Sequence, residues 1–162
     1  MLNSTVGGRL ISNVPIAISC YPGPQQNAAQ CESVDEQWTN PLYQATNPIG
    51  LSFPTDLTCP PVNLTAGQTP GTCTLGSNPV YAVDATKPSD VQAAVLFAKA
   101  TNVRLVIKDT GHDLLGRSDG YGSLEVWIHH LRTGLSFQQK YQSSCKATNW
   151  TGSAISVGGG YT

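Results

Sequence analysis

The sequence has few charges and no long apolar run. Only 12% of its 162 residues are charged, the formal net charge is −1, and no basic run or stripe is present. Nucleic-acid-binding proteins carry a clustered basic surface, so such a partner is not expected. No apolar stretch approaches the roughly 18 residues of a membrane helix, and the short run 14–20, interrupted by Pro15, does not resemble a signal peptide. We therefore expect no nucleic-acid or membrane partner. The chain is long enough to form one domain with a hydrophobic core.

Several common motifs are also missing. There is no Gly-Lys-Ser/Thr phosphate loop, no G-x-G-x-x-G segment that opens a helix and no G-x-S-x-G elbow. No histidine pair has metal-ligand spacing. His129 and His130 are adjacent, so we expect them to face opposite sides of a strand as ordinary strand residues. Neither a metal site nor a serine hydrolase is predicted.

The five cysteines form two local pairs and a remainder. Cys20 and Cys31 bracket one Pro/Gly-rich loop, and Cys59 and Cys73 bracket another. The spacings are too long for a zinc site, and no histidine lies nearby. We expect disulfides Cys20–Cys31 and Cys59–Cys73, which would restrain loops with little core of their own; four reduced, buried thiols are the alternative. Cys145 is left over, as a buried thiol or paired outside this chain.

Three N-glycosylation sequons begin at Asn3, Asn63 and Asn149. Together with the cysteine pattern and the low charge, they favour a secreted glycoprotein. Sugars would supply the solubility that a weakly charged surface lacks.

The composition divides the chain near residue 78. Residues 1–78 are rich in Pro, Gly, Asn, Thr and Cys and show no sustained hydrophobic period. We expect a loop-rich, disulfide-stapled N-terminal extension with a short helix around Val34–Trp38. Residues 79–162 show regular patterns, which predict an α+β fold.

This second region begins with a strand, a helix and a strand. The apolar run 79–85 predicts a buried strand, and the pattern over 87–102 predicts a helix with Pro88 and Asp90 in its first turn. Four residues fall on one face of that helix: Val91, Ala94, Val95 and Ala98. Alternation over 103–108 predicts the next strand and completes a βαβ unit, expected to be parallel and right-handed. Further strands are predicted over 123–128 and 152–157, the latter running into Gly158–Gly160.

Residues 108–123 place four glycines around His112: Gly111, Gly116, Gly120 and Gly122. The loop follows the carboxyl end of the 103–108 strand, where ligands bind in open α/β sheets. Glycines there let consecutive N–H groups converge on an anion. We predict a ligand site in this loop.

The stretch "VYAVDATKPSDVQAAVLFAKATNVRLVIKDTGHDLLGRSDGYGSLEVWIHHLR" resembles the FAD-binding domain of the vanillyl-alcohol-oxidase/berberine-bridge superfamily. Its "GHDLLGRS" loop resembles that of secreted fungal FAD-linked oxidases. The resemblance implies that residues 79–162 are the N-terminal part of a PCMH-type FAD-binding domain, preceded by the stapled extension 1–78.

The resemblance also implies roles for residues of the loop. His112 would bond covalently to the 8α-methyl group of FAD, and Asp113 would orient the imidazole or act as a turn residue. Arg117 would pair with a phosphate or bond a neighbouring loop, and Ser118 would donate to a phosphate or cap the turn. The cofactor-binding residues expected are Thr110, Gly111, His112, Asp113, Leu114, Leu115, Gly116, Arg117 and Ser118.

By the same resemblance, the chain would serve an oxidase that takes a hydride from a C–H next to oxygen or nitrogen of a small-molecule substrate. Dioxygen would reoxidise the flavin and give hydrogen peroxide. Similar chains continue well past Gly160, so a second polypeptide is expected to supply the rest of the FAD site, the catalytic residues and a substrate domain. The alternative is a secreted, disulfide-rich binding module without catalysis, which would not be yellow.

Overall fold

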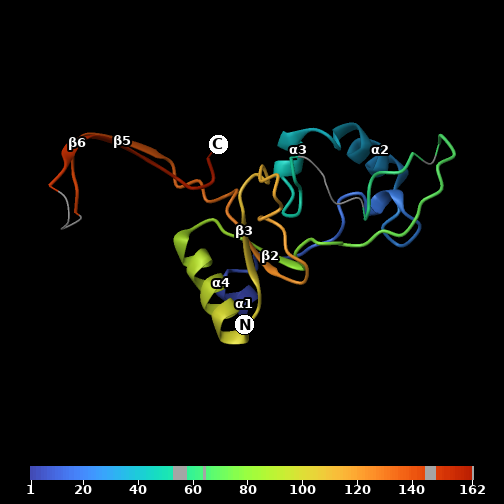
Figure 1. Ribbon diagram of the computed structural model, residues 1–162, viewed down its shortest axis with the longest axis horizontal. Coiled ribbons are helices and arrows are strands. Elements are labelled where there is room, and N and C mark those ends of the chain that lie inside the picture. The colour runs from blue at the N-terminus through green and yellow to red at the C-terminus, as the bar shows by residue number, and fades with distance from the viewer. Residues whose placement is uncertain (53–57, 64, 145–148, 162) are drawn as a thin grey trace.

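A four-stranded sheet forms the centre of the molecule, with a disulfide-linked lobe to one side and a projecting hairpin to the other (Figure 1). The computed structural model describes residues 1–52, 58–63, 65–144 and 149–161. The elements, in chain order, are α1 (Leu2–Thr5), β1 (Leu10–Ser12), η1 (Ile18–Cys20), α2 (Ala28–Gln37), α3 (Pro41–Ala45), β2 (Tyr81–Asp84), α4 (Pro88–Thr101), β3 (Leu105–Lys108), β4 (Leu124–Trp127), β5 (Leu135–Gln142) and β6 (Thr151–Val157). This mixed α+β architecture is the predicted class.

The central sheet has the strand order β1-β2-β4-β3. Both β2 and β3 pair in parallel with β4, which lies between them, and β1 pairs antiparallel with β2. The predicted strand–helix–strand unit is therefore present, but its two strands are separated by a third that follows later in the chain. The carboxyl ends of the three parallel strands consequently meet at one edge of the sheet.

Helix α4 begins and ends where the sequence predicts. Pro88 occupies its first turn, and Asn102 ends it in the left-handed conformation with φ 54°. Ala94 and Ala98 are buried as expected, whereas Val95 is 45% exposed. The predicted apolar face is therefore displaced by one residue, because Phe97, and not Val95, packs with Val91 against the core.

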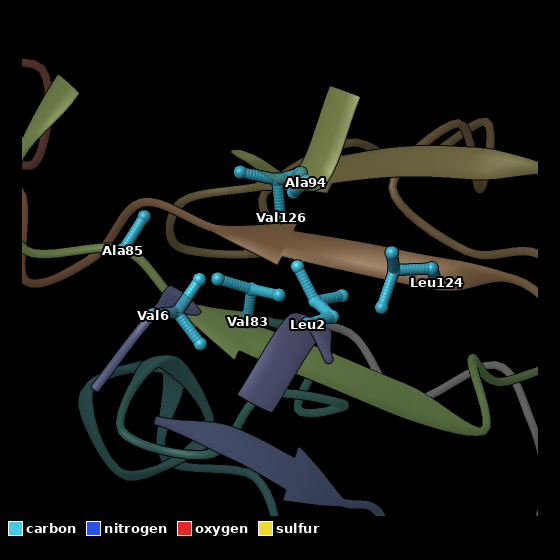
Figure 2. Close-up of a cluster of buried hydrophobic side chains, with 7 residues drawn as sticks. All are labelled: Leu2, Val6, Val83, Ala85, Ala94, Leu124 and Val126. Atoms are coloured by element: carbon cyan, nitrogen blue, oxygen red, sulfur yellow. The ribbon is translucent and has the colours of Figure 1, made fainter. Parts of the chain in front are cut away.

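The core under α4 joins the N-terminal segment to the central strands. Figure 2 shows Leu2 and Val6 of the α1 segment packed against residues of β2 and β4. Seven buried side chains form this cluster: Leu2, Val6, Val83, Ala85, Ala94, Leu124 and Val126. The Arg9 guanidinium lies 2.7 Å from the buried Asp90 carboxylate in the first turn of α4. The segment before β1 is thus held to the sheet by apolar contacts and to α4 by an ion pair.

The disulfide-linked lobe has a small core of its own. The structure contains both predicted disulfides, Cys20–Cys31 and Cys59–Cys73. Around them lie Ala17, Tyr21, Val34 and Val62, all buried. The helix in this lobe, α2, is longer than the Val34–Trp38 segment predicted, because the Asn27 side chain caps it and accepts a hydrogen bond from the Gln30 N–H at 3.0 Å.

The hairpin consists of β5 and β6, which pair antiparallel in a separate two-stranded sheet. The 152–157 strand was predicted, but its partner β5 was not, because apolar and polar residues alternate only weakly in its sequence, "LSFQQKYQ". In the described part of the chain, no helix has the length and apolarity needed to span a membrane.

Candidate functional site

The parallel strands place several polar side chains at one edge of the sheet. Asp84 ends β2, Lys108 ends β3, and the chain turns directly after β4 at His129 and His130. Ligands of open α/β sheets bind outside the carboxyl ends of the strands. The glycine-rich loop that contains His112 leaves β3 at this same edge.

The His112 ring is held by Ser52, a residue that the sequence analysis did not identify. Its Nδ1 atom lies 2.7 Å from Ser52 Oγ, and the Ser52 N–H donates to the Gly111 carbonyl at 3.0 Å. Ser52 is buried, whereas His112 is exposed. A buried hydroxyl on the neighbouring segment therefore orients an imidazole whose other side faces solvent.

Gly111 allows the loop to approach that segment closely. Its φ is +79°, and a Cβ there would lie 2.5 Å from the Gly50 carbonyl oxygen. Lys108 adds a further tie, because its buried Nζ donates to the Asn47 carbonyl at 2.9 Å. Residues 47–52 thus form a brace, named here the 47–52 brace, that holds the start of the His112 loop from Lys108 to His112.

Asp113 and Arg117 are paired with each other. The Arg117 Nε and Nη2 atoms donate to Asp113 Oδ1 at 2.9 and 2.5 Å, and the Arg117 N–H donates to Oδ2. These hydrogen bonds lower the pKa of Asp113 and raise that of Arg117. Arg117 therefore bonds a residue of its own loop, not of a neighbouring loop as considered above, and Ser52 lies next to His112. Contact of Arg117 with a phosphate and orientation of the imidazole by Asp113 stay predictions.

The remaining predicted residues line the same loop. Leu114 and Leu115 are 67% and 81% exposed and form its apolar tip. Gly116 has φ +70°, and Thr110 and Ser118 are half-buried. The structure therefore brings the predicted residues together on one continuous surface loop.

A cofactor with a pyrophosphate needs N–H donors at its site, and the loop can supply them. The described residues provide no hydrogen-bond acceptor for the N–H groups of Gly111, His112 and Asp113. Three successive N–H groups without a partner suit an anion. The backbone N–H groups of the loop thus suit the pyrophosphate of a flavin dinucleotide, with the exposed imidazole of His112 beside them.

His129 and His130 are not strand residues, so that prediction was wrong. Strand β4 ends at Trp127, and the two rings follow in a turn with their centroids 5.1 Å apart. His130 Nδ1 lies 2.7 Å from Asp84 Oδ1, and His129 Nδ1 lies 3.6 Å from Asp109 Oδ1. Burial is the main cause that lowers the pKa of His129. Among the described residues, no group of three or more acidic, histidine or cysteine side chains could hold a metal ion.

The predicted glycine cluster after β6 packs against the same turn. A Cβ on Gly160 would lie 2.6 Å from the Ile128 and His129 carbonyl oxygens. Arg132 Nε also donates to the His129 carbonyl at 3.1 Å and to that of Gly160 at 3.3 Å. Gly160 and the start of the His112 loop therefore lie at the same edge of the sheet.

Lys108 and Glu125 lie buried on the sheet face under this edge. Glu125 is fully buried, and neither carboxyl oxygen has a hydrogen-bond partner among the described residues. Burial raises the pKa of Glu125 to about 8 and lowers that of Lys108 to about 8. The charge of Lys108 lowers the pKa of Glu125, and the charge of Glu125 raises the pKa of Lys108, but burial is the larger effect on both.

Sequence reasoning missed Ser52, Asn47 and Gly50, because they lie in a loop-rich region about 60 residues before His112. No local sequence pattern indicates these three residues. Their role follows only from the contact between residues 47–52 and the His112 loop. The sequon residues Asn3, Asn63 and Asn149 are all exposed. Cys145 lies outside the described residues.

Comparison with known proteins gives close relatives along nearly the whole chain. The FAD-linked oxidoreductase hmp9 of Hypomyces subiculosus is 48% identical over 161 residues, which cover 98% of this chain and 26% of that protein. The VAO-type flavoprotein oxidase VAO615 of Thermothelomyces thermophilus is 38% identical over 98% of this chain and 27% of its own length. No family profile matches.

A solved structure agrees with these relatives. The VAO-type flavoprotein MtVAO713 from Myceliophthora thermophila C1 superposes with a TM-score of 0.86 at 50% identity, over 95% of this chain and 27% of that one. The chain spans about a quarter of the length of the relatives it matches. It is therefore a homologue of the VAO-type flavoproteins and FAD-linked oxidoreductases, and corresponds to their N-terminal part.

Proposed function

We propose that this chain is the N-terminal part of an FAD-dependent oxidase in which His112 carries the flavin covalently. The observation that supports the proposal most directly is the loop itself. The N–H groups of Gly111, His112 and Asp113 have no acceptor among the described residues, and the exposed His112 ring contacts the buried Ser52 hydroxyl. The homology to FAD-linked oxidoreductases supplies the cofactor.

The residues of this chain would bind the FAD and orient the His112 ring. Backbone N–H groups from Gly111 to Asp113 would donate to the pyrophosphate, and the exposed Leu114 and Leu115 would cover an apolar part of the cofactor. Ser52 and the 47–52 brace would hold His112 against the 8α carbon. When bound, FAD accepts a hydride from a substrate C–H next to oxygen or nitrogen and passes the electrons to dioxygen, giving hydrogen peroxide.

An imidazole nitrogen of His112 would bond to the 8α carbon, with loss of one N–H and one C–H bond. The two protons and two electrons released would pass to dioxygen, giving hydrogen peroxide. The bond would prevent loss of the flavin outside the cell.

The relatives are about four times as long as this chain, so we propose that a part equivalent to their remaining three quarters, in the same or another polypeptide, completes the enzyme. It would supply the rest of the FAD site and the domain that binds the small-molecule substrate. The catalytic residues are expected there.

The test of covalent attachment is acid precipitation of the purified native protein, which should be yellow. We expect the flavin absorbance to stay with the protein pellet, because a covalent bond survives unfolding. Release of all flavin into the supernatant would exclude the bond to His112 and leave non-covalent binding. A colourless protein that also fails to bind added FAD would contradict the proposal as a whole.

Secretion is proposed from the two disulfides and the three exposed sequons. The Asn63 side chain stands in an exposed turn, where its Oδ1 accepts hydrogen bonds from Thr65 Oγ1 and the Ala66 N–H. We expect the intact mass of the native protein to fall on endoglycosidase treatment, with Asn63 modified. An unchanged mass would count against passage through the secretory pathway.

A further inference from the structure

The Asn63 side chain stands at the rim of a groove in the disulfide-linked lobe. Its backbone N–H donates to Gln68 Oε1 at 3.0 Å, and its carbonyl accepts from the Gln68 N–H at 3.2 Å. Its Oδ1 accepts from Thr65 Oγ1 and from the Ala66 N–H, at 2.8 and 2.9 Å. The remaining polar atom, Nδ2, has no partner among the described residues, and it is the atom that carries an N-linked sugar.

The groove has a volume of about 290 Å³ and lies between helix α2 and the Asn63 turn. Four residues of α2 line it at positions that share one face of a helix: Ala28, Ala29, Glu32 and Asp35. On the other side, Val62 is buried in the core of the lobe together with Val34 of α2. Both walls of the groove therefore belong to one packed body.

The lining offers both kinds of contact that a sugar ring makes. Ala28 and Ala29 are small and exposed, so they leave room for a ring and give it an apolar surface. The exposed carboxylates of Glu32 and Asp35 have no hydrogen-bond or ion-pair partner in the described chain, and carboxylate oxygens accept hydrogen bonds from hydroxyl groups. Ligand pockets begin at roughly 300 Å³, so the groove suits one ring and not a branched glycan.

We infer that this groove holds the first N-acetylglucosamine of a glycan on Asn63. The acetamide methyl and ring C–H groups pack on Ala28 and Ala29, and sugar hydroxyl groups donate to Glu32 and Asp35. The inference rests on the proposed secretion in one respect, that Asn63 is glycosylated. It adds that the first sugar is a fixed part of the disulfide-linked lobe, beyond its effect on solubility.

The test is the rate at which peptide N-glycosidase releases the glycan from Asn63 in the native protein, secreted from a eukaryotic host. The enzyme cleaves at Nδ2 and leaves an aspartate, which peptide mass spectrometry follows at this site alone. A docked first sugar should slow the cleavage. Glu32→Ala/Asp35→Ala removes both acceptors, so release should be about tenfold faster than from wild type.

The matched control is Ser33→Ala/Glu36→Ala, which changes two exposed residues of α2 outside the groove lining and should keep the wild-type rate. All three proteins should release the glycan equally fast after denaturation. Once the glycan is removed, the two double variants should melt at the same temperature. A lower melting temperature of Glu32→Ala/Asp35→Ala at that stage would mean that the carboxylates support α2 itself, which overturns their assignment to the sugar.

The remaining outcomes separate this inference from the proposed secretion. Equal release from native wild type and both double variants would overturn the inference and leave the glycosylation of Asn63 standing. An Asn63 peptide that carries no sugar in the secreted protein would overturn the inference together with the modification on which it rests.

Discussion

Replacing His112 with alanine is expected to move all of the flavin from the pellet to the supernatant on acid precipitation. The other two basic side chains of the loop are engaged elsewhere, because the buried Lys108 donates to the Asn47 carbonyl and the Arg117 guanidinium is paired with Asp113. Ser52→Ala should leave the flavin bound but lower its covalent fraction, since the 2.7 Å contact that fixes the His112 ring is lost. Ser52→Thr keeps the hydroxyl and should restore much of the covalent fraction.

The control for this experiment is His130→Ala, which removes another imidazole at the same sheet edge. That ring is held by Asp84 and not by Ser52, so the variant should keep its flavin in the pellet. The measurement is the flavin absorbance of pellet and supernatant, with the melting temperature of each variant recorded beside it. Covalent flavin in His112→Ala would refute the assignment of the attachment site. Full covalent attachment in Ser52→Ala would limit the role of Ser52 to folding.

Glu125→Gln is expected to flatten the pH dependence of stability between about pH 5 and pH 8. In the unfolded chain Glu125 has its ordinary pKa of 4.5, whereas burial raises its folded pKa to about 8. Between these values the folded protein binds a proton that the unfolded chain has lost, so stability falls as pH rises. The fall is on the order of a few kcal/mol for the wild type, and glutamine has no proton to lose.

Lys108 does not reverse this expectation in that pH range. Its folded pKa is lowered to about 8, so its own contribution to the pH dependence falls mainly above pH 8, up to its ordinary value of 10.5. The measurement is the urea midpoint at pH 5 and pH 8. Glu36→Gln on the exposed side of α2 is the matched control and should keep the wild-type dependence. An identical difference in midpoint for Glu125→Gln and wild type would show that Glu125 is ionised in the folded protein.

The helix α4, the strand β3 and the two disulfides could be predicted from the sequence, because each is determined by residues close together in the chain. Pro88 and Asn102 mark the ends of α4 through their own backbone preferences, and the structure places both as expected. Short loops between cysteines define the two disulfides in the same way. The glycine pattern around His112 indicated a ligand loop after β3, and the strand does end at Lys108. The motif likewise indicated the family.

The brace and the strand order were decided by tertiary structure. Nothing in residues 47–52 predicts a contact with Gly111 and His112, because the Ser52 hydrogen bonds join loops separated by about 60 positions in sequence. The insertion of β4 between β2 and β3 is likewise a matter of pairing, since every strand here could pair with any other of similar length. This arrangement brings Asp84, Asp109 and the His129–His130 pair to one edge of the sheet. Local backbone preferences do not specify that these residues lie together. Local sequence thus determined the elements and the loop, while packing between distant segments determined what surrounds His112.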